Sequence, residues 1–551
     1  MADIPALPLL KGTVHLEDAL DDDDDMLAQL RYPRQKEEFW DYLLAHKADI
    51  ENMVRYHLGI NSCHVCVREI WKSGSFNVVI PILTPVSGRR GHNKVYIRFP
   101  LPYKIGEANS PGNVEEKLRT EIATYIWLHE QCPDVPIPTL HGFGLPDGQC
   151  FTHPQNTSFF ARVIWEIKRR VLSFLGLPTP CNYVRRRLHN PFKSGYLILG
   201  EAEGEPLHQS WEAHRHDKFY RSRLFHSLAR ISLSLNKSPL PRIGSLTFDS
   251  RGTISLSNRP LTLYLQMLEN EGIPSGIPRQ RTYASVEPYI SDLLSFQDNK
   301  ILCQPNAVRD RNDGEMQMAA LTALRATMHR FIRTQYRDGP FFLTLTDLHR
   351  SNIWVDEQWN IQTIIDLEWA CSQPVEMQLP PYWLTSKAVD GFDEPESVAE
   401  LDTLLKEYFD IYEEEEKTRN GTLYQAPIMR HAWDTGSFWY FQAVKIPKGM
   451  YRVFNSNIQP LFNKEHWKEP VFDQVFWWYW GVRAQEVMER KIKDREDYVM
   501  QLNEAFGADA QRNTVQITTN GEDTAKHKAV EIATLQILDM DKEHEDNGHA
   551  H

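Results

Sequence analysis

The segment at positions 341–369, FFLTLTDLHRSNIWVDEQWNIQTIIDLEW, constrains the fold of this chain more than any other part of it. Short apolar runs that are typical of buried strands enclose a polar loop in this segment. Asp347 follows the first run, Asn352 stands five residues further along the loop, and Asp366 follows the apolar run IQTII. We therefore expect a strand–loop–strand unit that carries these three polar side chains.

These residue types suit phosphoryl transfer. That reaction requires an acid to orient or deprotonate the acceptor hydroxyl, and oxygen ligands for a Mg²⁺ ion that bridges the nucleotide phosphates. Asp347 suits the base, and Asn352 and Asp366 suit the metal ligands, because Mg²⁺ prefers carboxylate and amide oxygens.

The chain before this segment has a recognisable order. A strand-like stretch is broken by Ser73, Gly74 and Ser75, and a strand follows in which Val95, Ile97 and Phe99 alternate with polar residues. A strong helix then precedes the strand YLILG, and the second half of the chain is mainly helical. This order predicts an α+β fold with a small mixed lobe, a larger helical lobe and a cleft between them.

Charge and composition predict the boundaries. The 551 residues carry a net charge of −13, most of it on residues 1–25 and 507–551. Acidic segments poor in apolar residues bury too little surface to fold, so we expect disordered tails at 1–30 and 507–551. Between them we expect the small lobe over 31–200, interrupted by an insertion at 151–193, and the helical lobe over 201–506.

The sequence LTDLHRSNIWVD…IIDLEW resembles the catalytic core of the aminoglycoside phosphotransferase and choline-kinase-like family, whose fold is protein-kinase-like, and its fungal members in particular. The resemblance implies that Asp347 is the catalytic base, that His349 orders the loop, and that Asn352 and Asp366 bind Mg²⁺. In the small lobe it implies an ATP-binding set: the phosphate-covering loop, a strand cation with its helix partner, and a linker that meets the adenine. These residues are Ser73, Gly74, Ser75, Arg98, Glu121 and Glu201.

The sequence departs from the family pattern at three points. Leu345 and Thr346 replace the usual His-Gly, Arg98 stands where a lysine is usual, and the phosphate loop has one glycine. Glu115 and Glu116 compete with Glu121 as the partner of the cation. A pseudokinase-like nucleotide- or ligand-binding module is therefore the alternative to a phosphotransferase acting on a small-molecule hydroxyl. A protein kinase is disfavoured because no D-F-G or A-P-E motif follows Asp366.

The insertion at 151–193 is strongly basic and surrounds the apolar run VLSFLGL. It suits contact with an anionic membrane surface over 161–193, but we favour a helical hairpin that covers the small lobe. The acidic total argues against nucleic acid as a partner. Seven scattered cysteines and the lack of a signal-peptide pattern favour a cytoplasmic protein, and we expect a monomer.

Overall fold

The computed structural model describes residues 6–85, 92–188, 190–192, 194–466 and 471–517. The chain forms two compact units, one made of residues 1–33 with 493–551 and the other of residues 34–492. Each unit is described by itself. Within the described ranges, no helix has both the length and the apolar character needed to cross a membrane.

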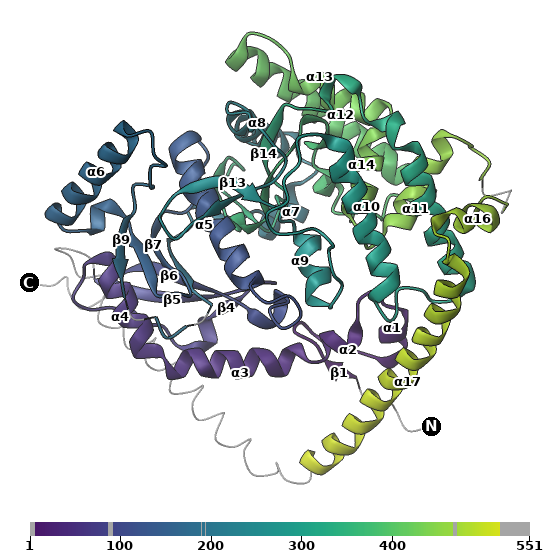
Figure 1. Ribbon diagram of the computed structural model, residues 1–551, viewed down its shortest axis with the longest axis horizontal. Coiled ribbons are helices and arrows are strands. Elements are labelled where there is room, and N and C mark those ends of the chain that lie inside the picture. The colour runs from purple at the N-terminus through teal and green to yellow at the C-terminus, as the bar shows by residue number, and fades with distance from the viewer. Residues whose placement is uncertain (1–5, 86–91, 189, 193, 467–470, 518–551) are drawn as a thin grey trace, which may run out of the picture. The chain divides into compact units, whose positions relative to one another are not determined.

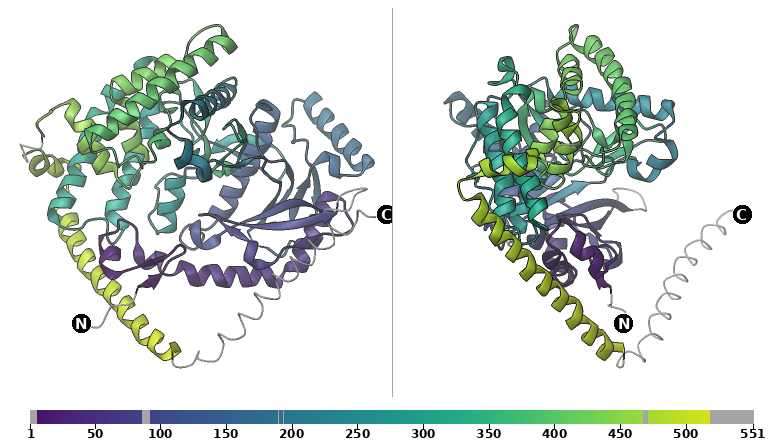
Figure 2. Two further views of the ribbon diagram at one scale, coloured as in Figure 1. Left: turned by 180° about the vertical axis from the view of Figure 1, so that it is seen from behind. Right: turned by 90° about the vertical axis from the view of Figure 1, so that its right-hand side faces the viewer.

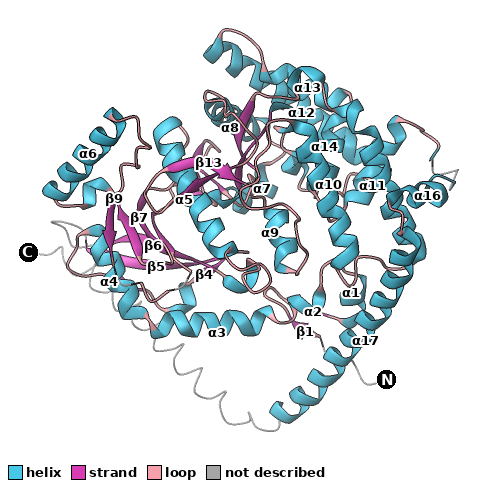
Figure 3. Ribbon diagram, in the orientation of Figure 1, coloured by secondary structure: helices cyan, strands magenta, loops and turns pink. Residues whose placement is uncertain are grey.

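The N-terminal part of the larger unit contains an antiparallel sheet (Figure 1; Figure 3). Its strands run in the order β3-β5-β6-β10-β7-β8-β9, and β4 pairs with β5. Their bounds are β3 (His64–Val65), β4 (Lys72–Ser73), β5 (Asn77–Pro85), β6 (His92–Pro100), β7 (Leu140–Gly144), β8 (Gln149–Thr152), β9 (Val184–Arg187) and β10 (Tyr196–Gly200). The alternation predicted around Val95 to Phe99 is confirmed as β6, an interior strand that pairs with β5 and β10.

Helices cover this sheet. Trp40, Leu43 and Val54 from α3 (Tyr32–Ala45) and α4 (Lys47–Leu58) pack with Ile80 of β5 and Ile97 of β6 in one core. A second core joins α5 (Asn113–Gln131) to other strands, and it includes Leu118, Ile122, Phe143 and Leu197. Arg98 and Ile97 are neighbours on a strand, so their side chains point to opposite faces of the sheet. The side chain of Arg98 faces Glu121 of α5.

The remainder of the larger unit is mainly helical and lies beside the sheet-rich part in the left view of Figure 2. Its helices include α7 (Leu207–His214), α8 (Lys218–Leu235), α9 (Leu263–Asn270), α10 (Val286–Cys303), α11 (Arg311–Phe331), α12 (Pro395–Asn420), α13 (Gln425–Asp434), α14 (Ser437–Lys445), α15 (Met450–Val453) and α16 (Val471–Phe476). Small sheets accompany them: β11 (Glu205–Pro206) with β15 (Ile353–Val355) and β16 (Ile361–Ile364), β12 (Ser245–Phe248) with β13 (Ile254–Asn258), and β14 (Phe341–Leu345) with β17 (Ala370–Pro374). The expected α+β division into a small mixed part and a larger helical part is confirmed.

The smaller unit corrects the expectation of a disordered segment over residues 1–30. Residues 6–30 form β1 (Leu7–Pro8), β2 (Thr13–Val14), α1 (Leu16–Asp21) and α2 (Met26–Gln29). Leu7, Val14 and Met26 are buried with Tyr498 and Leu502 of α17 (Ala484–Ile517), a helix that extends into the predicted C-terminal tail. The acidic run even has a structural use, because the carboxylate of Asp25 caps α2. Residues 518–551 of the predicted tail lie outside the described residues.

The basic insertion also differs from the expected helical hairpin. It forms one helix, α6 (Phe159–Phe174), followed by the strand β9, which pairs with β8 and extends the sheet. The apolar residues that we expected to cover the small lobe are mostly exposed on α6.

Candidate functional site

The hairpin formed by β15 and β16 brings two of the predicted metal ligands side by side. The backbone N–H of Ile365 donates to the carbonyl oxygen of Asn352 at 3.0 Å. Asn352 directly precedes β15 and Asp366 follows β16, so both residues lie at the same end of the hairpin. Asp366 has a left-handed backbone with φ of 60°, which turns the chain sharply after β16. Residues that lie fourteen positions apart in the sequence thus share one end of a hairpin.

Asp347 occupies the other side of this loop, and its side chain is 16% exposed. The amide Nδ2 of Asn352 donates to the carbonyl oxygen of Asp347 at 2.9 Å and to its carboxylate at 3.3 Å. Burial, and then the nearby carboxylates of Glu368 and Asp366, raise the pKa of Asp347 to about 7. A carboxylate with a pKa near neutrality is suited to accept a proton at physiological pH.

His349 contacts both its own loop and Asp347. Its Nδ1 accepts a hydrogen bond from the backbone N–H of Ser351 at 3.2 Å, which leaves the proton of the neutral ring on Nε2. That Nε2 lies 3.5 Å from Oδ1 of Asp347. Burial, with a contribution from Arg350, lowers the pKa of His349 and favours this neutral form.

Thr346, one of the departures from the family pattern, has a defined structural contact. Its hydroxyl and its backbone N–H both donate to the carbonyl oxygen of Trp369, the N–H at 3.2 Å. The indole N–H of Trp383 donates to the carbonyl oxygen of Leu348 at 2.9 Å. The segment that carries Asp347 is therefore fastened on both sides of this residue.

Arg98 is brought together with Glu121, as predicted, and with two further acids. Its guanidinium lies 2.6 Å from Glu121 and 2.7 Å from Asp366, and it also bonds Glu368. The side chains of Arg98, Glu121 and Glu368 are 4%, 1% and 2% exposed, so the two ion pairs among them are shielded from water. The side chain of Asp366 is 38% exposed. Glu116 pairs with Arg259 and Glu115 with Arg119, and the competition among the three glutamates is resolved in favour of Glu121.

Sequence reasoning missed three members of this cluster, which are Glu368, Lys117 and Asn77. Lys117 is fully buried, and its Nζ lies 2.8 Å from Oδ1 of Asn77, 3.5 Å from Glu368 and 3.7 Å from Glu121. Asn77 in turn donates to Glu368 at 2.8 Å. The spacing of Lys117 and Glu121, four residues apart on one helix, was the available signal.

The charges of the cluster do not balance. Three carboxylates, from Glu121, Asp366 and Glu368, face the two cations Arg98 and Lys117. Burial raises the pKa of Glu121 to about 7, although the guanidinium of Arg98 opposes this. Burial alone would raise the pKa of Glu368, but the positive charges of Arg98 and Lys117 outweigh burial and hold this pKa below its usual range. The cluster therefore has room for additional positive charge.

The predicted phosphate loop lies at the turn between β4 and β5. The backbone N–H of Gly74 donates to the carbonyl oxygen of Asn77 at 2.9 Å, which closes the turn, and Ser73 and Ser75 flank it. Directly after the turn, Phe76 packs against Trp369 with ring centroids 5.0 Å apart. The loop is therefore anchored next to the segment that begins at Asp366.

Glu201 follows the last residue of β10. Its carboxylate accepts a hydrogen bond from the hydroxyl of Tyr96 at 3.2 Å. Two residues further on, the hydroxyl of Thr363 bonds both the N–H and the carbonyl oxygen of Glu203. Because Thr363 belongs to β16, this linker is attached to the strand that leads to Asp366.

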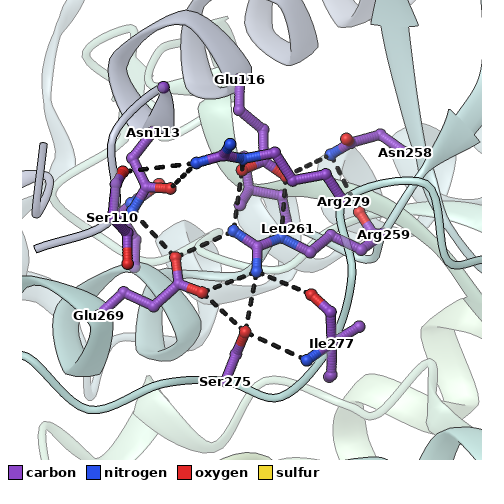
Figure 4. Close-up of polar contacts among 12 residues, drawn as sticks. Ser110, Asn113, Glu116, Asn258, Arg259, Leu261, Glu269, Ser275, Ile277 and Arg279 are labelled. Carbon is purple, nitrogen blue, oxygen red and sulfur yellow. Dashed lines mark hydrogen bonds and ion pairs between the residues drawn. The ribbon is translucent and has the colours of Figure 1, made fainter.

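A second buried network holds the start of α5 (Figure 4). Arg259 bonds Glu116 of α5 at 2.8 Å and Glu269 of α9 at 2.7 Å. Asn113 donates to Glu269 at 2.9 Å, and Arg279 also bonds Glu116. These contacts fix the helix that presents Lys117 and Glu121 to the site.

A cavity of about 240 Å³ opens in the helical part, with Asp347 in its wall. Its lining is mainly apolar and aromatic; of the described residues that line it, Asp347 and Lys445 carry charged groups. Lys445 donates to the carbonyl oxygen of Met377 at 2.8 Å and to Gln373 at 3.2 Å. Burial lowers its pKa to about 8. A narrow cleft on the other side of Asp347 is lined by Asp366.

The donor set around Asp366 fits Mg²⁺ better than a metal that requires a protein cage. Across the described ranges, no three His, Cys, Asp or Glu side chains are grouped to hold an ion. Mg²⁺ is commonly bound through one or two protein oxygens, with water and substrate phosphates completing the shell. Asn352 uses its amide N–H groups on Asp347, which leaves the amide oxygen as a ligand of the correct type.

Comparison with known proteins gives little beyond this geometry. No family model matches the sequence, and no curated protein matches it. The similar solved structures include GDP complexes of a point mutant and of the wild type of aminoglycoside 2′-phosphotransferase-IIIa. Both are 12% identical to this chain, cover 84% and 82% of it and 99% of their own chains, and have TM-scores of 0.35 and 0.34. Similarity at this level does not indicate a function for this chain.

Proposed function

We propose that this protein is an ATP- and Mg²⁺-dependent phosphotransferase that transfers the γ-phosphoryl group to a hydroxyl of a small molecule. One observation carries the proposal: Asp347 lies in the wall of the cavity and also in the wall of the cleft that contains Asp366. An acid in this position can contact an acceptor on one side and face a phosphate on the other.

The residues have distinct roles in this proposal. Asp347 accepts the proton of the acceptor hydroxyl. The hydroxyl oxygen of the acceptor then forms a bond to the γ-phosphorus, and the bond between the γ-phosphorus and the departing ADP breaks. Asn352 and Asp366 would hold Mg²⁺, which neutralises phosphate charge when it is bound. Glu121 orients Arg98, and the turn at Ser73 to Ser75 covers the phosphates. The linker at Glu201 contacts the adenine of ATP.

The cavity lining indicates the kind of acceptor. A polycationic compound would need several acids to compensate for its lost hydration, and the described lining offers only Asp347. Tyr264, Tyr289 and Tyr408 line the same cavity, whose lining is otherwise mainly apolar. We therefore propose a mainly apolar or aromatic acceptor with one reactive hydroxyl, and not an aminoglycoside.

The test is γ-phosphate transfer by the purified protein to a panel of hydroxyl compounds that includes apolar, aromatic and aminoglycoside members. Asp347→Asn should lower turnover by roughly 10²-fold or more, because it removes the base, and should retain nucleotide binding. Glu357→Gln, at an exposed acid in the turn of the same hairpin, is the matched control and should keep both properties. Wild-type turnover by Asp347→Asn would show that Asp347 is not the base.

One observation favours a nucleotide-binding module without turnover as the second candidate. Arg98 is committed to three carboxylates and is almost fully buried, which reduces its capacity to contact phosphate. A rise in melting temperature with Mg·ATP, together with no consumption of ATP on any acceptor of the panel, would favour this candidate over the enzyme.

A further inference from the structure

Helix α6 presents an exposed apolar face along its whole length. The residues of this face are large, and most of them are far more exposed than a helix packed on a core allows: Phe159, Phe160, Val163, Ile164, Ile167, Val171 and Phe174. At about 100° per residue they fall on one side of the helix, and the exposed Leu175 and Leu177 continue the patch. Phe160 is 77% exposed and Phe174 is 91% exposed.

The opposite side of α6 attaches it to the sheet-rich part. Trp165 is buried, and its indole N–H donates to the carbonyl oxygen of Cys181 at 3.0 Å. Arg169 donates to the carbonyl oxygen of Pro180 at 2.9 Å. Figure 1 shows α6 at the margin of the larger unit, apart from the helices of the C-terminal part. Trp165 and Arg169 therefore hold the helix to the sheet-rich part, and the apolar face of Phe160 and Phe174 points outward.

Basic residues border this apolar face. Lys168 and Arg170 stand at its two edges by helical position, and residues 159–187 carry seven Lys and Arg with Glu166 as their acid. Glu166 bonds Arg169 and Arg170, at 2.9 Å and 3.0 Å. The segment has a net charge of +6 within a chain of net charge −13, so its partner should be anionic as well as apolar.

We propose that α6 docks on the surface of an anionic phospholipid bilayer. The phenylalanine and isoleucine side chains would enter the boundary between headgroups and acyl chains, and the bordering lysine and arginine side chains would reach the lipid phosphates. A single convex helix with aromatic residues at both ends suits a planar lipid surface. This proposal is independent of the proposed phosphotransfer, because it concerns a face distant in sequence from Asp347.

The test uses the full-length protein without nucleotide, in vesicle co-sedimentation. Vesicles of phosphatidylcholine with about one third phosphatidylserine should bind the protein, and vesicles of phosphatidylcholine alone should bind it roughly tenfold more weakly or not at all. High salt should weaken binding. The double variant Phe160→Ser/Phe174→Ser should lose binding by roughly tenfold or more and remain folded, because both side chains are exposed.

Phe219→Ser is the matched control, since Phe219 is an exposed aromatic residue on α8 and should not affect binding. Lys168→Glu/Arg170→Glu should weaken binding to the anionic vesicles only. The proposal is wrong if the wild type ignores both kinds of vesicle, or if Phe160→Ser/Phe174→Ser binds as the wild type does. It is also wrong if the apolar face instead mediates self-association, seen as a dimer that dissociates in Phe160→Ser/Phe174→Ser without any vesicle binding.

Discussion

Replacing Lys117 by methionine should strongly destabilise the larger unit, because Lys117 is a buried cation in a cluster with excess negative charge. The change keeps the volume of the side chain and removes its charge. It leaves Arg98 as the cation facing Glu121, Asp366 and Glu368, and it removes the hydrogen bond from Lys117 to Asn77.

The distances give the magnitude. A pair of unit charges at the 3.5 Å that separates Lys117 from Glu368 attracts by about 4–5 kcal/mol at an effective dielectric constant near 20. The pair at 3.7 Å with Glu121 adds a similar attraction. The desolvation of the ammonium group opposes both, and removal of one partner from a buried ion pair typically costs about 3–5 kcal/mol, which is our expected loss.

The assay is urea unfolding of the wild type, Lys117→Met, Glu368→Gln and the double variant. The double variant should be considerably more stable than the sum of the single losses implies, since it removes a cation and an anion together. Lys72→Met, on the exposed surface of β4, should change the free energy of unfolding by less than about 0.5 kcal/mol. Additive effects, or a loss below about 1 kcal/mol for Lys117→Met, would refute the electrostatic account.

Two further predictions concern other parts of the site. Thr346→Val should cost about 1 kcal/mol in unfolding free energy, because it removes the hydroxyl bond to Trp369, and should lower kcat more than it raises KM; an unchanged kcat would contradict a role in positioning Asp347. Lys445→Met should be more stable than the wild type near neutral pH, by up to about 3 kcal/mol. The lowered pKa of Lys445, about 8, means that the folded wild type holds its proton less tightly than the unfolded chain. The wild type therefore gains stability as the pH rises above about 8, and the difference should shrink in thermal unfolding between about pH 7 and pH 10; a difference that grows with pH would contradict the burial of a charged amine.

The sequence indicated those candidate site residues whose signal is local or lies in a family pattern. Asp347, Asn352 and Asp366 stand on one strand–loop–strand unit, and the resemblance to the phosphotransferase family implied that Arg98 and Glu121 are partners. The structure brings both groups together, joined by the bond between Arg98 and Asp366.

Other parts could not be predicted, because they depend on contacts between distant residues. In the sequence, Lys117 resembles an exposed lysine on a helix. In the structure it is buried and contacts Asn77 and Glu368, which are distant in the sequence. Residues 6–30 look like an acidic tail, and their core forms with Tyr498 and Leu502, more than 450 residues away in the sequence. The exposure of α6 is of the same kind, since an amphipathic pattern does not reveal which face is covered.

The most direct test of the account is the Mg²⁺ dependence of nucleotide binding, followed by isothermal titration calorimetry. The cluster at Asp366 has more carboxylates than cations, so phosphates should be repelled until Mg²⁺ binds. The account predicts that the wild type binds ATP with Mg²⁺ and roughly tenfold or more weakly with a chelator, and that Asp366→Asn loses the Mg²⁺-dependent part. Equal binding of ATP with and without Mg²⁺, or wild-type binding by Asp366→Asn, would contradict it.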